Sequence, residues 1–243
     1  MPRRLDRADA TAFHGGPSAP AHPVVPSRLF LLFRPILAGA NARDRLVACL
    51  GALFGIALTA AVTSATPGLV LAVPMGATAV LLFAVPSSPL AQPWPVIGGN
   101  TVSAVVGLLV GALVPDERLA AGAAVACAIA VMSLLRCLHP PGGAVALLVA
   151  TGGAAASGLW FPAVVAANCL VLVGAGWLFH RVSGHSYPHR AALAAAPEPF
   201  GVTADDIDRA LEDVDEAFDI SRADLVALLE RAEAHAAQRR RLM

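Results

Sequence analysis

Charged residues are what this sequence lacks most. They make up 14% of its 243 residues, against 57% hydrophobic residues, whereas a soluble domain usually carries about 25% charged residues. Residues 46–115 contain no Asp, Glu, Lys or Arg, and residues 119–180 contain only Arg136. A soluble protein needs surface charge to resist aggregation. The composition therefore excludes a soluble globular protein and predicts an integral membrane protein, because each stretch can hold about three spans of roughly 20 residues.

Lysine is absent altogether, and the 17 arginines do not gather into a basic patch. They are balanced by 17 acidic residues, so the formal net charge is zero and no nucleic-acid partner is predicted. The four cysteines lie in or beside apolar segments and form no CxxC pair: Cys49, Cys127, Cys137 and Cys169. Such cysteines usually pack as small apolar side chains, so we expect neither a metal site nor a cofactor.

Six apolar segments can be drawn, at about residues 46–65, 69–85, 96–114, 119–137, 141–153 and 160–180. The second carries Pro74 near its start, and the fifth lies between Pro140-Pro141 and Gly152-Gly153. The fifth is therefore about 20 Å long as a helix, which is shorter than a hydrocarbon core of about 30 Å. The expected fold is an all-α membrane protein of about six embedded segments, with the second and fifth broken or re-entrant.

The two uncharged stretches share a pattern at an offset of 67 residues. Pro74-Met-Gly-Ala-Thr-Ala-Val-Leu-Leu aligns with Pro141-Gly-Gly-Ala-Val-Ala-Leu-Leu-Val, and Trp94-Pro95 aligns with Phe161-Pro162. If each half has three segments, the second half is inverted relative to the first, and inverted repeats with interrupted helices are typical of transporters. Chance matches in a sequence of low complexity are the alternative, and both stay open.

The chain divides into four parts: a tail at 1–30, a membrane domain at 31–185, a linker at 186–200 and a helical segment at 201–243. The tail is rich in Pro, Ala and Arg and has no apolar core, so we expect it to be disordered and not a secretory signal. In the last part, Thr203 and Ser221 are each placed to cap a helix. This helical segment is either a small hairpin, packed on itself or on the bundle, or an element for partner binding or homo-oligomerisation.

Basic residues flank the segments unevenly. They lie before the first segment, after the fourth and after the sixth, at Arg34, Arg43, Arg45, Arg136, Arg181 and Arg190. The acidic pair Asp116-Glu117 lies between the third and fourth segments. Because basic residues concentrate on the cytoplasmic side of membrane proteins, we expect both termini in the cytoplasm. The expected location is a plasma, or inner, membrane that the chain crosses several times.

The most informative motif is Arg136-Cys-Leu-His-Pro-Pro-Gly-Gly. Its two prolines end one helix, and Pro141 can begin the next. Free N–H groups and the dipole of a new helix favour an anion, and Arg136 and His139 add positive charge and donors. Each also has a structural interpretation, Arg136 as an anchor at the cytoplasmic interface and His139 as the cap of a turn.

A counterpart motif, Pro74-Met-Gly-Ala-Thr, lies in the first half. If the halves are inverted, the two short helix starts face each other near the middle of the membrane. Asn100 adds a polar group, although a lone Asn more often forms a bond between helices. The predicted solute-binding residues are Arg136, His139, Pro140, Pro141, Gly142, Gly143, Pro74, Gly76, Thr78 and Asn100.

Four ordered motifs give the chain a family resemblance. Cys137-Leu-His-Pro-Pro-Gly-Gly-Ala, Val73-Pro-Met-Gly-Ala-Thr, Ser88-Pro-Leu-Ala-Gln-Pro-Trp and Gly98-Gly-Asn resemble the HPP family of integral membrane proteins over about residues 30–185. The resemblance identifies His139-Pro140-Pro141 as the motif that names the family. Plant plastid members of the family are associated with nitrite import, and some relatives have His where this chain has Asn100. Some relatives carry a pair of nucleotide-sensing CBS modules, for which the C-terminal part of this chain is too short.

The sequence predicts a transporter or channel for a small solute, and the resemblance points to a nitrite-like anion. The alternative is a structural or sensory membrane protein that moves no solute and binds a partner through its C-terminal helices. We do not expect an enzyme, because the segments offer no paired carboxylates, metal cluster or Ser/His/Asp set. The segments also hold no lone carboxylate, which favours a channel or facilitated carrier over a proton symporter.

Overall fold

The computed structural model describes residues 42–152, 158–190, 204–213 and 219–241. The expected disordered tail at 1–30, most of the expected linker and the cap residue Thr203 lie outside the described residues. All regular secondary structure within the described ranges is helical, as the composition predicted.

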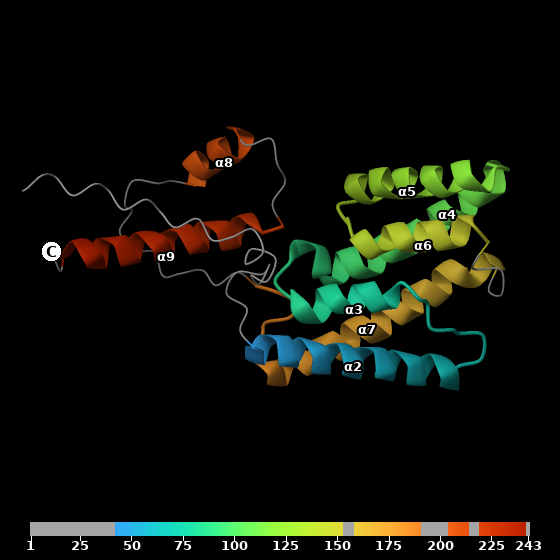
Figure 1. The fold of residues 1–243 in the computed structure, drawn as a ribbon, viewed down its shortest axis with the longest axis horizontal. Helices are drawn as coiled ribbons and strands as arrows, with labels where there is room; N and C mark the ends of the chain where they lie inside the picture. Colours follow the sequence, from blue (N-terminus) through green and yellow to red (C-terminus); the bar gives the residue numbers. More distant parts are fainter. Residues whose placement is uncertain (1–41, 153–157, 191–203, 214–218, 242–243) are drawn as a thin grey trace, which may run out of the picture. The chain divides into compact units, whose positions relative to one another are not determined.

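Each of the six apolar segments forms a helix in the described part of the chain (Figure 1). The bounds are α2 Ala42–Ala65, α3 Met75–Ala84, α4 Asn100–Leu113, α5 Glu117–Leu134, α6 Pro140–Ala150 and α7 Phe161–Ser183. Short helical turns lie at η1 (Pro89–Ala91), η2 (Pro95–Gly99) and η3 (Gly158–Trp160), and η2 is a π-helical turn that runs into α4.

Four helical stretches are long and apolar enough to cross a membrane: Ala42–Ala65, Pro95–Leu113, Glu117–Leu134 and Gly158–Ser183. The other two, α3 and α6, have 10 and 11 residues. At 1.5 Å per residue they are about 15–17 Å long, roughly half of a hydrocarbon core. They are therefore too short to be ordinary spanning helices, as their proline and glycine residues predicted.

The second segment begins its helix later than expected, at Met75 instead of residue 69. Leu69 to Ala72 have no regular structure. Pro74 explains the difference, because a proline disfavours helical geometry in the residue before it. The helix can start only after Val73, with the N–H of Met75 bonded to the carbonyl of Ala72 at 2.9 Å.

Small residues let the helices approach closely. A Cβ added at Gly107 would lie 2.7 Å from the carbonyl oxygen of Ala146, and one added at Gly111 would lie 3.1 Å from that of Ala150, so α4 and α6 touch backbone to backbone. A Cβ added at Gly51 of α2 would lie 2.4 Å from the ring of Phe83, so that this side chain packs directly on the backbone of α2. The pairs Gly51/Gly55 and Gly107/Gly111, each four residues apart on one helix, therefore serve packing within one molecule.

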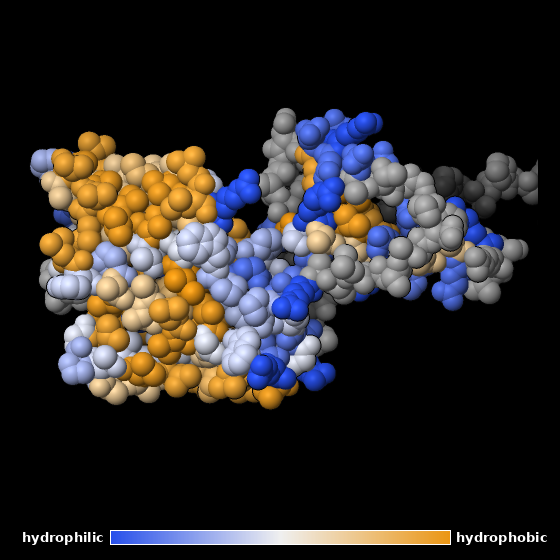
Figure 2. Space-filling model, turned by 180° about the vertical axis from the view of Figure 1, so that it is seen from behind, coloured by the Kyte–Doolittle hydropathy of each residue, from blue (hydrophilic) through white to orange (hydrophobic). Residues whose placement is uncertain are grey.

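The surface of the membrane domain is largely apolar, and Figure 2 shows hydrophobic side chains covering much of one face. Several large side chains are more than two-thirds exposed: Leu53, Val73, Leu113, Leu134, Leu159, Trp160 and Val182. Soluble monomers rarely expose apolar surface on this scale. These side chains are placed to face lipid, and α2 begins at the same end of the bundle at which α7 ends (Figure 1).

Two further helices follow the membrane domain, α8 (Ala204–Asp213) and α9 (Arg222–Arg241). Ser221 caps α9 by accepting a hydrogen bond from the N–H of Asp224 at 3.1 Å, which confirms the expected cap. Arg222 bonds Asp208 at 2.5 Å and so ties α9 to α8. This bond lowers the pKa of Asp208 below its usual value.

Candidate functional site

Three predicted site residues from different helices meet in one buried hydrogen-bond network. Thr78 lies on α3, Asn100 begins α4, and His139 is the N-cap residue of α6; all three are fully buried. Thr78 Oγ1 is 3.1 Å from His139 Nε2 and 3.4 Å from Asn100 Nδ2. The start of α6 is thereby linked to the first turn of α3, which is the pairing of the two interrupted helices that the sequence suggested.

The hydrogen positions of His139 follow from its partners. Nδ1 lies 2.8 Å from the carbonyl oxygen of Leu90, which can only accept, so Nδ1 carries a hydrogen. In the neutral ring Nε2 then has a lone pair and accepts the hydroxyl hydrogen of Thr78. Thr78 has a second acceptor within reach, the carbonyl of Pro74 at 3.3 Å, but only one hydrogen to give.

Asn100 has one polar atom that the network leaves out. Its Nδ2 donates to the carbonyl of Val96 at 2.9 Å and to Thr78, and this fixes the orientation of the amide. Its Oδ1 is buried and has no hydrogen-bond partner in the described chain. Leaving a buried acceptor unsatisfied costs about 1–3 kcal/mol. Native structures rarely hold such an atom without a reason, and an ion, a water molecule or a ligand is the usual one.

The helix starts offer fewer free N–H groups than the sequence argument assumed. The first two residues of α6 are Pro140 and Pro141, which have no N–H, and the N–H of Gly142 bonds the carbonyl of His139 at 2.8 Å. At α3, the N–H groups of Met75, Gly76 and Thr78 also have backbone partners. The helix ends alone therefore make a weak anion site, and the side chains must supply most of the chemistry.

Arg136 lies outside the network. It is exposed, and its φ of 53° is left-handed. The N–H of Cys137 donates to the carbonyl of Met132 at 2.9 Å. The N–H of Arg136 donates to the carbonyl of Ser133 at 3.1 Å. This pair of bonds is the Schellman motif that ends a helix, with Arg136 in the position where glycine is usual. The fourth segment therefore stops at Leu134 instead of residue 137.

The remaining predicted residues divide by burial. Pro74, Pro141 and Gly142 are buried, and a Cβ on Gly142 would meet Ser103 and Met132. Gly143 is partly buried, whereas Gly76 and Pro140 are exposed, and a Cβ on Gly76 would meet nothing within 4 Å. The structure thus brings together Thr78, Asn100 and His139, with Pro74 and Gly142 behind them.

Sequence reasoning missed several supporting groups. Leu90 supplies only its carbonyl, which no sequence pattern reveals. Gly99 allows α4 to touch the chain before α6, since a Cβ there would lie 2.5 Å from the carbonyl oxygen of Cys137. Asn168 of α7 bonds the backbone before α3, accepting from the N–H of Ala72 at 3.1 Å and donating to the carbonyl of Val70 at 2.9 Å. A lone Asn inside an apolar segment was the available signal.

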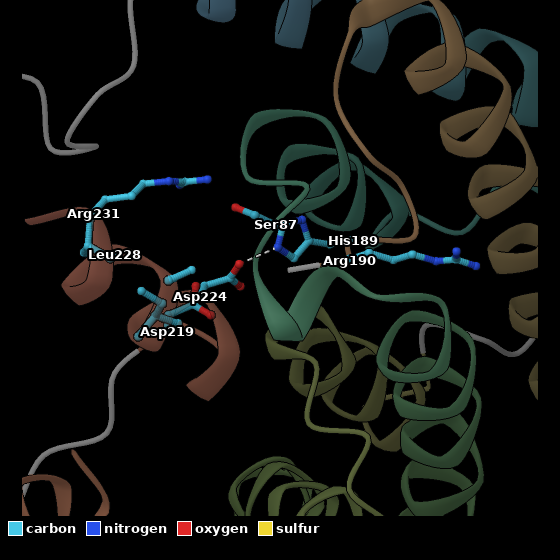
Figure 3. A pocket seen from close by; sticks show the side chains of 9 residues that line it. Ser87, His189, Arg190, Asp219, Asp224, Leu228 and Arg231 are labelled. Carbon is cyan, nitrogen blue, oxygen red and sulfur yellow. Dashed lines mark hydrogen bonds and ion pairs between the residues drawn. The ribbon is translucent and has the colours of Figure 1, made fainter. Parts of the chain in front are cut away.

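A second polar region lies where α9 meets the segment between α3 and α4. Asp219 accepts from Ser88 at 2.8 Å, and Asp224 bonds His189 at 2.8 Å beside a cavity of 410 Å³ (Figure 3). Burial works to raise the pKa of Asp224, but hydrogen bonds from Ser221 and His189 outweigh it and hold that pKa below its usual value. The cavity is lined by Ser87, His189, Arg190, Asp219, Ile220, Asp224, Ala227, Leu228 and Arg231.

Metal ligands do not cluster within the described ranges: no group of three or more His, Cys, Asp or Glu side chains there could hold an ion. The network of Thr78, Asn100 and His139 is instead a set of neutral donors and acceptors. Such a set can bind a small polar solute by hydrogen bonds.

Comparison with known proteins agrees with this architecture. Two transmembrane proteins of Dictyostelium discoideum are each 46% identical to the chain, over 80 and 76 residues. These matches cover 31% and 30% of the chain but only 28% and 24% of the relatives, so the chain spans about a quarter of their length. No solved structure matches. The sequence model of the HPP transmembrane region matches residues 38–188, more than half of the chain, and the protein therefore belongs to the HPP family of membrane proteins.

Proposed function

We propose that the protein is a transporter or channel for a small solute, which passes between the starts of α3 and α6. The observation that carries this proposal is the buried, unpartnered Oδ1 of Asn100 at the place where the two short helices meet. Membrane transporters commonly bind their solutes where helices are interrupted. An acceptor that is costly to bury is best explained there by a solute, or by a water molecule that accompanies the solute, that donates a hydrogen bond to it.

The solute that we propose is a small anion such as nitrite. Nitrite itself is suggested by the HPP resemblance. The exposed Arg136 supports an anion in a different way from the one the sequence suggested. It stands three residues before His139, outside the network, where its charge would attract anions toward the site and not hold them in it.

Two inverted three-helix halves, α2–α4 and α5–α7, are the architecture that we propose around this site. Each half runs long, short, long. The halves also make corresponding contacts, since Asn168 of α7 bonds the chain before α3 and Gly99 touches the chain before α6. Whether four or six of the helices cross the membrane, the number is even and both termini lie on one side; the arginine distribution supports the cytoplasmic side of a plasma membrane.

A flux measurement in proteoliposomes tests the proposal. The full-length protein should release or take up nitrite, or another member of a panel of small anions, faster than protein-free vesicles. Thr78→Val should reduce this flux by about tenfold or more, since it removes the hydroxyl that joins His139 to Asn100. Thr59→Val is the matched control, because Thr59 is equally buried but bonds only the carbonyl of Gly55 in its own helix.

Three outcomes are informative. Flux that falls in Thr78→Val and persists in Thr59→Val supports the site. Equal flux in both variants would rule out this site as the pathway. Absence of flux for every anion would favour the competing function, a structural or sensory membrane protein that binds a partner through α8 and α9.

A further inference from the structure

The buried network contains a ring nitrogen that can take up a proton. We propose that the anion crosses this site together with one proton, and that Nε2 of His139 is the atom that takes the proton up. This proposal rests on the proposed transport function and deepens it. It names the solute as a weak acid, whose anion crosses the site together with a proton, so that no net charge is moved.

The three network residues have no charged partner in the described chain. Thr78 and Asn100 are neutral, and no Asp, Glu or Arg forms a hydrogen bond or ion pair with the three network residues in the described chain. Two thiols lie beside the network: that of Cys137, two residues before His139, and that of Cys169, which contacts Asn100. An unpaired anion in such a site would be strongly disfavoured, whereas an anion that arrives with a proton adds no net charge.

Nε2 is the one atom of the His139 ring that can receive a proton. Nδ1 already carries a hydrogen, which it gives to the carbonyl of Leu90. Nε2 holds a lone pair toward Thr78. Protonation there needs no tautomer change, and the hydrogen bond to Leu90 stays in place.

The hydroxyl of Thr78 can bond the His139 ring in either protonation state. When Nε2 is bare, the hydroxyl donates to it across 3.1 Å. When Nε2 is protonated, the hydroxyl must accept from it and turn its own hydrogen elsewhere, and the carbonyl of Pro74 lies 3.3 Å away to receive that hydrogen. Asn100 Nδ2 donates to the hydroxyl oxygen in both states. The network therefore satisfies the protonated histidine as well as the neutral one.

Oδ1 of Asn100 is an acceptor that has no donor in the described chain. An anion brings no donor for Asn100 Oδ1, but the O–H of a protonated small acid does. The acid enters with its O–H donating to Oδ1. Its proton then reaches Nε2 by a relay, in which the hydroxyl of Thr78 gives its own hydrogen to Nε2 and receives the hydrogen of the acid, which leaves the anion and an imidazolium. The reverse transfer restores the neutral acid on exit. An intramembrane carboxylate, which the sequence lacks, is not needed for this coupling, because an imidazole can carry the proton.

Simultaneous measurement of anion and proton flux tests the proposal in the wild-type protein. Proteoliposomes holding the full-length protein and an internal pH dye receive external nitrite, with the membrane potential clamped by potassium and valinomycin. We expect nitrite entry to acidify the interior with one proton per anion, and we expect the rate to be insensitive to the clamped potential. Protein-free vesicles supply the background from nitrous acid that crosses lipid unaided.

His139→Gln extends the test, because glutamine can keep a hydrogen bond but cannot take a proton. We expect it to abolish the acidification of the interior that accompanies nitrite entry. His180→Gln is the control: His180 is also buried and bonded to a backbone carbonyl, that of Leu82 at 3.0 Å, and should keep the coupling.

The measurements distinguish a failure of the proton proposal from a failure of the transport function. Nitrite flux that follows the membrane potential without acidification would overturn the proton proposal and leave the transport function standing. Coupling that survives in a folded His139→Gln protein would overturn the role of Nε2. No flux of any anion would overturn the transport function and this proposal with it.

Discussion

Two histidines of this protein occupy opposite settings, and both contact the segment that joins α3 to α4. His139 is fully buried between a carbonyl and a hydroxyl, and its Nδ1 bonds Leu90 of that segment. His189 lies near the surface against the carboxylate of Asp224, and its backbone N–H bonds the side chain of Gln92 at 2.9 Å. The comparison teaches that partners, and not residue type, decide the role: His139 lies between neutral groups that can bond either form of its ring, while His189 is held against a carboxylate.

The largest effect on stability is expected from a substitution that adds an atom beside His139. Gly99→Ala would place a Cβ 2.5 Å from the carbonyl oxygen of Cys137 and 2.8 Å from the Cβ of His139. Both neighbours are held by the start of α6, so the substitution should destabilise the protein by about 1–3 kcal/mol. Thermal unfolding in detergent measures this.

Gly122→Ala is the control for crowding, because a Cβ on Gly122 in α5 would meet nothing within 4 Å. It should be neutral, or stabilising by up to about 1 kcal/mol through the higher helix propensity of alanine. Equal unfolding temperatures for the two variants would show that the buried region repacks more easily than the comparison assumes.

An intermediate effect on stability is expected at Arg136. Substitutions there distinguish the cost of its backbone conformation from the contribution of its charge. A non-glycine residue in the left-handed region costs about 1–2 kcal/mol, so Arg136→Gly should raise the unfolding temperature. If the arginine also attracts anions, the same variant should show slower flux despite its greater stability, and Arg136→Lys should keep most of the flux. A stabilised Arg136→Gly protein with unchanged flux would leave the residue with a structural role alone.

The smallest effect on stability is expected at the contact between His189 and Asp224, and this effect depends on pH. The pKa of Asp224 is lower in the folded chain than its usual value of about 4. The carboxylate contact therefore stabilises the docking of α9 above that value, and the stabilisation is lost as the pH falls through the lowered pKa. The protection of residues 86–92 against hydrogen exchange, taken relative to the intrinsic exchange rate at each pH, should be high at neutral pH and lower below about pH 4.

Asp224→Asn should show the faster exchange at neutral pH already. Asp208→Asn provides the control, because Asp208 bonds Arg222 within the C-terminal helices and not the 86–92 segment. If exchange in residues 86–92 were the same in both variants, the His189 contact would have no part in holding that segment.

The sequence predicted the helices well and the site in part, for physical reasons. Runs of apolar residues and the prolines at 74, 140 and 141 specify where helices lie and where they break, and Ser221 specified a cap. The same apolar runs carry no periodic sign of which face is buried, because lipid-facing and packed positions are alike hydrophobic. The exposure of Gly76, the left-handed backbone of Arg136 and the unpartnered Oδ1 of Asn100 depend on that choice of face and could not be predicted.

Whether solute reaches the buried network is tested most directly by thiol labelling. In a protein whose four native cysteines are replaced by alanine, Thr78→Cys and Thr59→Cys would each be exposed to a small, anionic, membrane-impermeant thiol reagent. Both positions are fully or almost fully buried, so burial alone predicts equal inertness. The account predicts that Thr78→Cys is modified, that nitrite slows its modification, and that Thr59→Cys stays unmodified. A Thr78→Cys protein that is as inert as Thr59→Cys, or that is modified at a rate nitrite does not change, would contradict the network as the solute site.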